Sequence, residues 1–193
     1  MFKQKDLPQF PKLEKEKARK LFIRGLQNAN AGKLAAALAY TGHFKSLFVF
    51  DKKEKAEIKK IRDEELHHRH RIRVMLAEMG AKPRLSREIL MACIGGTIGF
   101  LCLFGGWFIP MYGAGQLEST NIFEYEVAAR LAHSAGQNLY VDELLAFGEL
   151  EWDHEVYFRK KTESHFLARW VPLWQSPDPK PTIRNLYESW AKN

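Results

Sequence analysis

The sequence has few cysteines, and their spacing excludes two kinds of site. Cys93 and Cys102 lack the spacing of a metal knuckle or a redox pair, and both lie in one apolar segment, so we interpret them as small buried hydrophobic residues. No apolar stretch follows the basic N-terminus closely enough to form a secretory signal. These absences predict a reducing compartment, with the chain on the cytoplasmic side of a membrane.

Acidic residues are in the minority. The 193 residues include 23 Asp and Glu against 30 Lys and Arg, for a net charge of +7, and much of the excess lies between Lys3 and Arg24. A basic chain attracts nucleic acid or anionic lipid, and charge alone does not separate the two because both attractions are independent of sequence. The apolar segment favours lipid, so we expect an anionic membrane surface as a partner and no nucleic acid.

Charge of either sign is missing between Glu88 and Glu118. Residues 89–112 are long enough to span a hydrocarbon core of about 30 Å. A single span there would place the metal ligands predicted below on opposite sides of the bilayer, and repeated glycines interrupt the segment. We therefore predict a membrane-associated crossover over residues 89–115, as in a peripherally bound, monotopic protein.

Four other runs carry apolar residues at helical spacing. They predict helices over residues 13–47, from an N-cap at Asp51 to Gly80, over 116–133 and over 139–165. A basic leader (residues 1–12) precedes them, and a tail (residues 166–193) ends in a short helix. The pattern predicts a single all-α domain over residues 1–193, with an antiparallel four-helix bundle over residues 13–165 and a long hydrophobic crossover between its second and third helices.

Two Glu-x-x-His pairs fall on apolar stripes of this bundle. Glu65 and His68 continue the stripe of the second helix, whereas the overlapping pair one residue earlier shares a charged face. Glu151 and His154 are in phase with the apolar residues of the fourth helix. A buried carboxylate and imidazole one turn apart are costly unless a divalent metal accepts both as ligands. Ferritin-like di-iron bundles use this arrangement, with a lone Glu from each remaining helix.

The lone glutamate of the third helix has three candidates, Glu118, Glu124 and Glu126. Ligands at one level of an antiparallel hairpin lie about equally far from the turn, which favours Glu118, with Glu124 second. In the first helix Lys33 stands where the fourth acid is expected. Lys33 either replaces one cation and leaves a salt-bridged core, or lines a mononuclear or unusual dinuclear site. His43 lies off that level, and we interpret it as a helix-end or surface histidine.

The order of these residues resembles the demethoxyubiquinone hydroxylase family, which are ferritin-like di-iron monooxygenases acting on a quinone precursor. The resemblance covers roughly residues 20–160. The family's His-Ala-Gly-Glu motif falls on residues 30–33 and its Tyr-x-Gly on residues 40–42, so the chain departs from it at Asn30 and Lys33. The family's later motifs fall on the other predicted elements: Glu65, His68, Lys82-Pro83, Gly95 to Gly106, Glu118, Glu151 and His154. Its third-helix His-Tyr pair is Glu124-Tyr125 here.

The resemblance implies an oxygen-dependent hydroxylase of a hydrophobic, quinone-like substrate. It would bind two irons, or one, with manganese as an alternative metal. The ligands would come from Glu65, His68, Glu118, Glu124, Glu151 and His154, and the reaction site would include Lys33, Tyr40 and Tyr125. The alternative is a non-catalytic relative with a degenerate metal site that binds lipid, quinone or a partner enzyme. Either protein could form a homo-oligomer.

Overall fold

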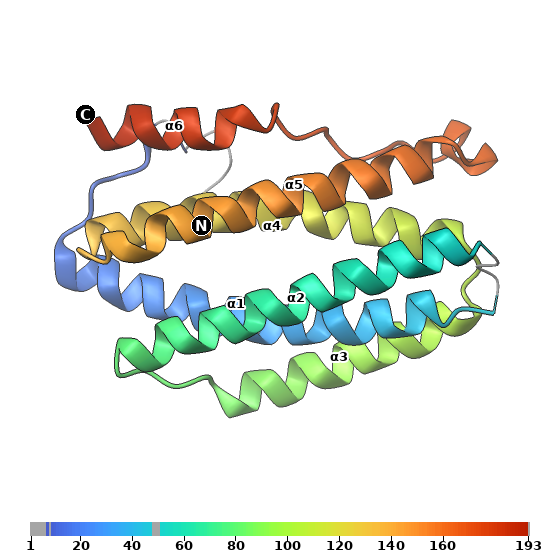
Figure 1. The fold of residues 1–193 in the computed structure, drawn as a ribbon, viewed down its shortest axis with the longest axis horizontal. Coiled ribbons are helices and arrows are strands. Elements are labelled where there is room, and N and C mark those ends of the chain that lie inside the picture. The colour runs from blue at the N-terminus through green and yellow to red at the C-terminus, as the bar shows by residue number, and fades with distance from the viewer. Residues whose placement is uncertain (1–6, 8, 48–50, 193) are drawn as a thin grey trace. The chain divides into compact units, whose positions relative to one another are not determined.

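The computed structural model describes residue 7, residues 9–47 and residues 51–192 of the chain. These residues form six α-helices and no strand, which confirms the predicted all-α class. The ferritin-like antiparallel arrangement stays a prediction. The helices are α1 (Lys15–Phe44), α2 (Lys52–Glu78), α3 (Leu85–Phe104), α4 (Phe108–Ser134), α5 (Val141–Glu163) and α6 (Pro181–Lys192), drawn in Figure 1.

The chain divides into two compact units. The α4–α5 unit comprises residues 1–22 and 111–193, and the α2–α3 unit comprises residues 23–110. Both α1 and α4 run through the boundary between the units. The single domain predicted over residues 1–193 stays a prediction.

The largest difference from the sequence prediction lies in the uncharged segment. The sequence predicts an interrupted crossover there, but its residues up to Phe104 form the continuous helix α3, and α4 begins at Phe108 rather than near Gln116. The break between them includes Gly106, whose φ of 72° suits a glycine. Pro110 lies in the first turn of α4, where its missing N–H costs no helical hydrogen bond. At the start of α2 the predicted N-cap is confirmed, since Asp51 accepts a hydrogen bond from the Lys53 amide.

Glycines let α3 pack against α1 in the α2–α3 unit. A Cβ atom added to Gly95 would lie 2.5 Å from the backbone of Ala35, and one added to Gly99 would lie 2.5 Å from the Leu38 carbonyl oxygen. A helical glycine costs about 1 kcal/mol relative to alanine. Close packing of two backbones offsets that cost, so Gly95 and Gly99 do not break α3, and the predicted interruption is limited to the break that includes Gly105 and Gly106.

The other side of α3 is exposed and apolar. By length and composition, α3 is the one helix of the described residues that could cross a membrane. Basic residues flank its start, where Lys82 and Arg84 precede the helix and Arg87 lies in its first turn. The large exposed hydrophobic residues of α3 are Leu85, Ile89, Leu90, Ile94, Ile98, Phe100, Leu101 and Phe104.

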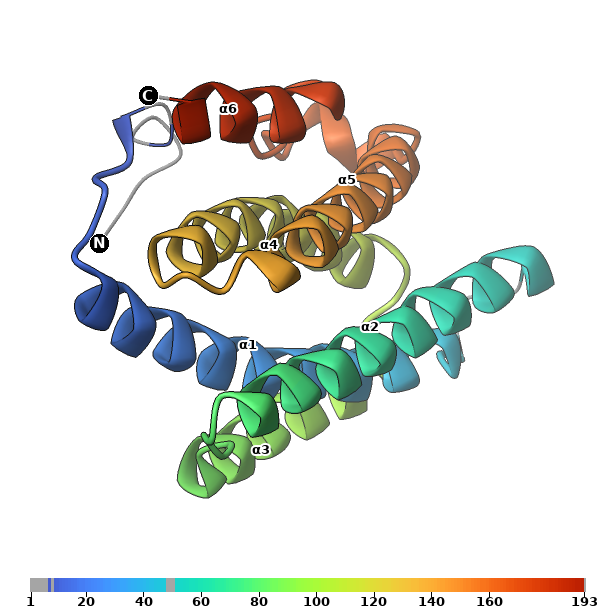
Figure 2. The same ribbon diagram turned by 60° about the vertical axis from the view of Figure 1, so that its left-hand side comes forward.

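In the α4–α5 unit, α4 and α5 run antiparallel and side by side (Figures 1 and 2). Gly136, with a φ of 72°, lies in the turn between them. The tail returns along α5 as α6, which buries Ile183 and Trp190. The indole N–H of Trp190 donates to the carbonyl oxygen of Phe10 at 2.7 Å, so α6 and the N-terminal segment fix each other in this unit.

Candidate metal centre

Three predicted ligands meet in the α4–α5 unit. Glu118 of α4 and the pair Glu151 and His154 of α5 are all buried. Each offers one ligand atom within 4.8 Å of the ligand atoms of the other two. Glu151 and His154 lie on the buried face of α5 because their spacing of three residues matches one helical turn. The structure therefore brings together the first-ranked glutamate of α4 and the Glu-x-x-His pair of α5.

An asparagine holds the two carboxylates. The Asn121 side-chain amide donates to Glu118 Oε2 at 2.8 Å and to Glu151 Oε2 at 3.4 Å. Nδ1 of His154 lies 3.7 Å from the same Glu151 oxygen. Sequence reasoning missed Asn121, although its position one turn after Glu118 was a signal that could have identified it.

The chemistry of this cluster fits a divalent cation. Two carboxylates buried side by side repel each other and lose their hydration, so a neutralising cation is favoured between them. Carboxylate oxygens with an imidazole nitrogen form a mixed oxygen and nitrogen ligand set that suits iron, manganese or zinc. Glu118, Glu151 and His154 are the residues that would hold the ion.

In the α2–α3 unit, Lys33 of α1 contacts one of the predicted metal ligands, Glu65 of α2. Lys33 Nζ of α1 lies 2.8 Å from Glu65 Oε1 of α2, and both side chains are buried. His68, one turn after Glu65, is buried as well. The Lys33–Glu65 pair is the contact that the salt-bridged alternative requires.

The remaining predicted site residues differ in exposure. Tyr40 and Tyr125 are buried, and the Tyr125 ring packs edge to face on Phe147 at 5.4 Å between centroids. Glu124 is exposed and lies outside the cluster of ligand atoms. Glu126 is buried, and burial raises the pKa of its carboxyl to about 7, with Arg130 acting to lower it.

Two minor expectations need correction. Cys102 is buried as expected, but Cys93 is exposed, because it lies on the outer side of α3. His43 does lie in the last turn of α1, but it is buried rather than at the surface. Burial lowers the pKa of its imidazole to about 4, because the charged form loses its hydration.

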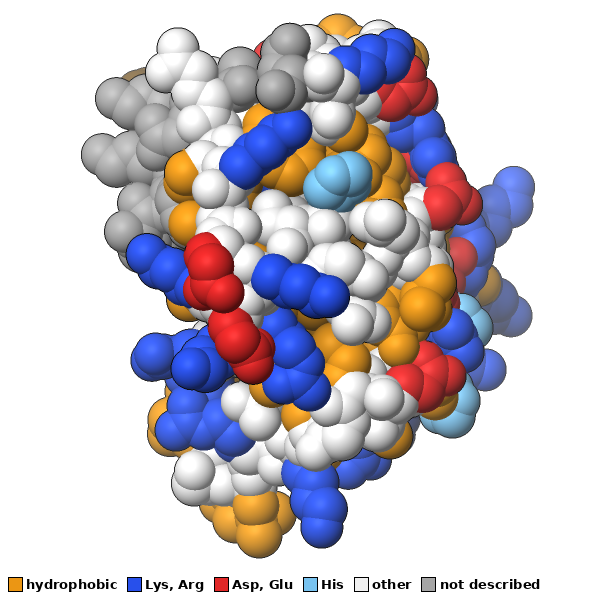
Figure 3. All heavy atoms as spheres, turned by 90° about the vertical axis from the view of Figure 1, so that its left-hand side faces the viewer, with side chains coloured by type: hydrophobic (Ala, Val, Ile, Leu, Met, Phe, Trp, Pro, Cys, Tyr) orange, Lys and Arg blue, Asp and Glu red, His pale blue; other side chains and the backbone are white. Residues whose placement is uncertain are grey.

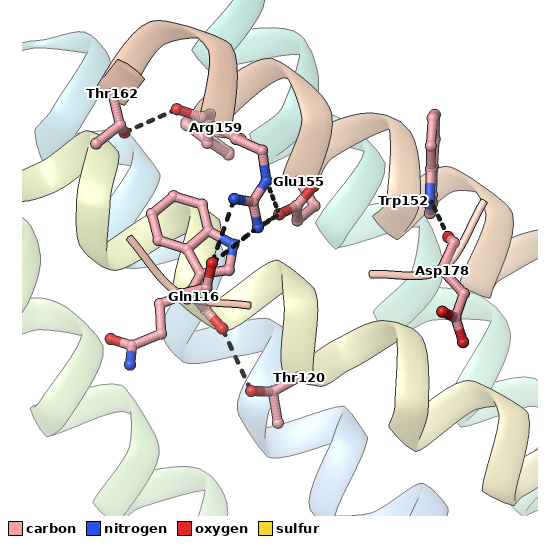
Figure 4. Close-up of polar contacts among 9 residues, drawn as sticks. Gln116, Thr120, Trp152, Glu155, Arg159, Thr162 and Asp178 are labelled. Carbon is pink, nitrogen blue, oxygen red and sulfur yellow. Dashed lines mark hydrogen bonds and ion pairs between the residues drawn. The ribbon is translucent and has the colours of Figure 1, made fainter. Parts of the chain in front are cut away.

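No pattern in the sequence predicts the contact that fastens the tail to α5 (Figure 4). The Trp174 indole N–H donates to Glu155 Oε1 at 2.6 Å, and Arg159 Nε donates to the same oxygen at 2.8 Å. The Trp174 ring also lies against Gly115 of α4, where an added Cβ would collide with it. Glu155 follows His154 directly in the sequence, so the tail is anchored beside a candidate ligand. We call this contact of Glu155, Arg159 and Trp174 the tail clamp.

Comparison of the chain with known families, curated proteins and solved structures finds no match.

Proposed function

We propose that Glu118, Glu151 and His154 bind a redox-active divalent metal, iron or manganese, and that the protein uses it to hydroxylate a hydrophobic, quinone-like compound with oxygen. The observation that supports the metal is the buried cluster of two carboxylates and an imidazole with ligand atoms within 4.8 Å. The reaction and the substrate class rest on the resemblance of the sequence to demethoxyubiquinone hydroxylases.

The residues of the α4–α5 unit would orient and shield the ion. The Asn121 amide donates to one oxygen of Glu118 and one of Glu151 and so orients both carboxylates. The second oxygen of each carboxylate would then coordinate the ion. Burial of all three ligands limits water access, and Tyr125 with Phe147 adds an aromatic contact in the same unit. The bound metal would supply the redox chemistry that activates oxygen, which these side chains lack, and an external two-electron donor would reduce the second oxygen atom to water.

Glu65 and His68 of the α2–α3 unit are the other Glu-x-x-His pair that the sequence predicts as metal ligands. Their burial is compatible with that role, since a buried acid and imidazole need compensation. The Lys33 ammonium already compensates one oxygen of Glu65. We therefore propose a site with fewer metal ions than the two irons that the resemblance implies.

A membrane surface is the proposed source of the substrate. The exposed apolar side of α3, with Lys82, Arg84 and Arg87 at its start, is suited to an anionic bilayer. Basic side chains are also prominent on the face drawn in Figure 3, in line with the net charge of +7. The α3 side chains would lie among the acyl chains, and a quinone-like compound is dissolved in that layer.

A second candidate is supported by the buried Lys33–Glu65 pair. In this version the lysine takes the place of a metal ion, and the protein is a non-catalytic binder of lipid, quinone or a partner enzyme. The two candidates differ in one measurable property, because only the first retains a metal in the unaltered chain.

The test is metal content per chain after expression with iron. We expect about one ion in the unaltered protein and a loss in Glu151→Gln, with Glu124→Gln as the control because Glu124 is exposed and outside the cluster. An unaltered chain free of metal would contradict the hydroxylase. The second candidate then expects Lys33→Glu to bind iron, and an unchanged iron content in that variant would contradict it.

A further inference from the structure

The turn that follows α5 exposes two large aromatic side chains. Phe166 is 62% exposed and Trp170 is 75% exposed. They stand at either end of the short 3-10 helix η3 (Phe166–Arg169) in the α4–α5 unit. We call residues 165–170 the aromatic turn. Leaving a large aromatic ring in water gives up the free energy that its burial would contribute. Two exposed aromatic side chains close together therefore indicate a contact surface.

Local contacts hold the aromatic turn in shape. The amide of Leu167 donates to His165 Nδ1 at 3.2 Å, and the amide of Trp170 donates to the Leu167 carbonyl at 2.9 Å. The His165 and Phe166 rings lie 4.6 Å apart between centroids. The outward position of the aromatic rings is therefore a property of a structured turn.

The rest of the tail ties the aromatic turn to the helices. The Tyr112 hydroxyl of α4 donates to the Pro172 carbonyl at 3.0 Å, and the ring of Tyr112 packs edge to face on Trp174. The tail clamp fixes Trp174 to α5. Anything that binds Phe166 and Trp170 is thereby fixed to α4 and α5.

Charge around the aromatic turn has one predominant sign. Lys160 and Lys161 precede it, Arg169 lies within it, and the one acid between residues 160 and 177 is Glu163. Arg169 lies over the Trp170 ring, with its guanidinium carbon 5.9 Å from the centroid. Lysine and arginine beside exposed Trp and Phe are typical of membrane interfaces, where the rings enter the headgroup layer and the cations meet anionic lipid.

We propose that the aromatic turn is an interfacial anchor that inserts Phe166 and Trp170 into the headgroup layer of an anionic bilayer. The anchor goes beyond the function proposed above, because it requires neither a metal nor the apolar side of α3. Lys160, Lys161 and Arg169 would bind lipid phosphates. A bilayer is favoured over a protein partner because the surface combines a small aromatic tip with a net positive charge.

The first test is flotation of the full chain with vesicles of phosphatidylcholine and phosphatidylglycerol in equal amounts. We expect Phe166→Ser/Trp170→Ser to lower the partition coefficient at least about tenfold, because two aromatic contacts with lipid are lost. The matched control is Leu139→Ser, since Leu139 is 73% exposed in the same unit but stands far along the chain from the aromatic turn. Equal partitioning of the double variant and the control would overturn the proposal.

The second test concerns charge. We expect Lys160→Gln/Lys161→Gln to weaken partitioning by about fivefold per lysine on anionic vesicles and to have little effect on pure phosphatidylcholine. An equal effect on both vesicle types, or none on either, would contradict the role given to the lysines. Variants of α3 in the same assay report on the proposed function separately, because they leave residues 160–170 intact.

A third measurement does not depend on loss of binding. Brominated lipids quench tryptophan fluorescence only at short range, so the unaltered chain and Trp170→Phe are compared on brominated anionic vesicles. We expect the quenched fraction to fall in Trp170→Phe. An identical quenched fraction would place Trp170 in water, overturn the anchor and leave a protein as the partner of the turn.

Discussion

Lys33 and Glu65 form a buried ion pair at 2.8 Å between α1 and α2, at the level where the sequence predicts a metal ligand from each helix. Both charges have lost their hydration, so each depends on the other. The pair therefore carries consequences for stability and for metal binding, and the two can be measured separately.

Removing one partner of the pair should be costly. We expect Lys33→Met to lower the free energy of unfolding by about 3–5 kcal/mol, because the buried Glu65 carboxylate loses the ammonium that lies 2.8 Å from it. The double variant Lys33→Met/Glu65→Leu should recover most of that loss, since an apolar pair replaces the ion pair. Urea unfolding measures both. The control is Lys60→Met, whose exposed pairs with Glu57 and Glu64 contribute at most about 1 kcal/mol.

Asn121 should act on metal binding without being a ligand. We expect Asn121→Ala to weaken metal affinity by about 10-fold to 100-fold, because its amide orients the carboxylates of Glu118 and Glu151. Titration calorimetry with Mn²⁺ gives the affinity directly. Thr120→Ala is the matched control, since its hydroxyl bonds only the Gln116 carbonyl at the surface of the same helix (Figure 4). Equal affinity in the two variants would refute this role.

Replacing neighbouring glycines of α3 with alanine should change the stability of the protein in opposite directions. We expect Gly95→Ala to destabilise the protein, because the new methyl group would meet the backbone of Ala35 at 2.5 Å. At the adjacent Gly96 a Cβ has no atom within 4 Å, so Gly96→Ala should stabilise the helix by about 0.5–1 kcal/mol. Thermal unfolding of the two variants measures both changes in stability. Equal changes would show that the close packing of α1 and α3 is absent in solution.

Stability should depend on pH through Glu126. Burial raises the pKa of this carboxyl from 4.5 to about 7, so the folded state holds a proton that the unfolded state releases between these values. Its stabilising contribution is thus complete below pH 4.5 and is lost as the pH rises through 7. We expect Glu126→Gln to remove this slope and to stabilise the protein at pH 8. Glu124→Gln, two residues away and exposed, should retain the slope.

Helical phase determines burial, so the sequence predicted well which Glu and His side chains are buried together, whereas their binding of a metal stays a prediction. Glu151 and His154 share a stripe with apolar neighbours in α5, and the structure buries both. The equal spacing of ligands from a hairpin turn favoured Glu118 over Glu124, and the structure buries Glu118 and exposes Glu124. Each inference used a property that repeats along one helix.

The parts that sequence reasoning missed depend on contacts between elements. Helix propensity predicts that Gly95 and Gly99 interrupt a helix, but their close packing against α1 makes them compatible with α3. Asn121 bridges carboxylates from two helices, and Trp174 reaches Glu155 from an irregular tail. No periodic pattern encodes such contacts, because they depend on how separate segments are brought together.

The tail clamp has an optical consequence. The Trp174 indole bonds Glu155, the neighbour of His154, and the Arg159 guanidinium carbon lies 4.8 Å from the centre of its ring. Indole emission is sensitive to a nearby charge and to the strength of the N–H bond. If α5 shifts when Glu151 takes up the proposed ion, the emission of Trp174 would change with it, and this indole would then report occupancy of the proposed centre without an added label.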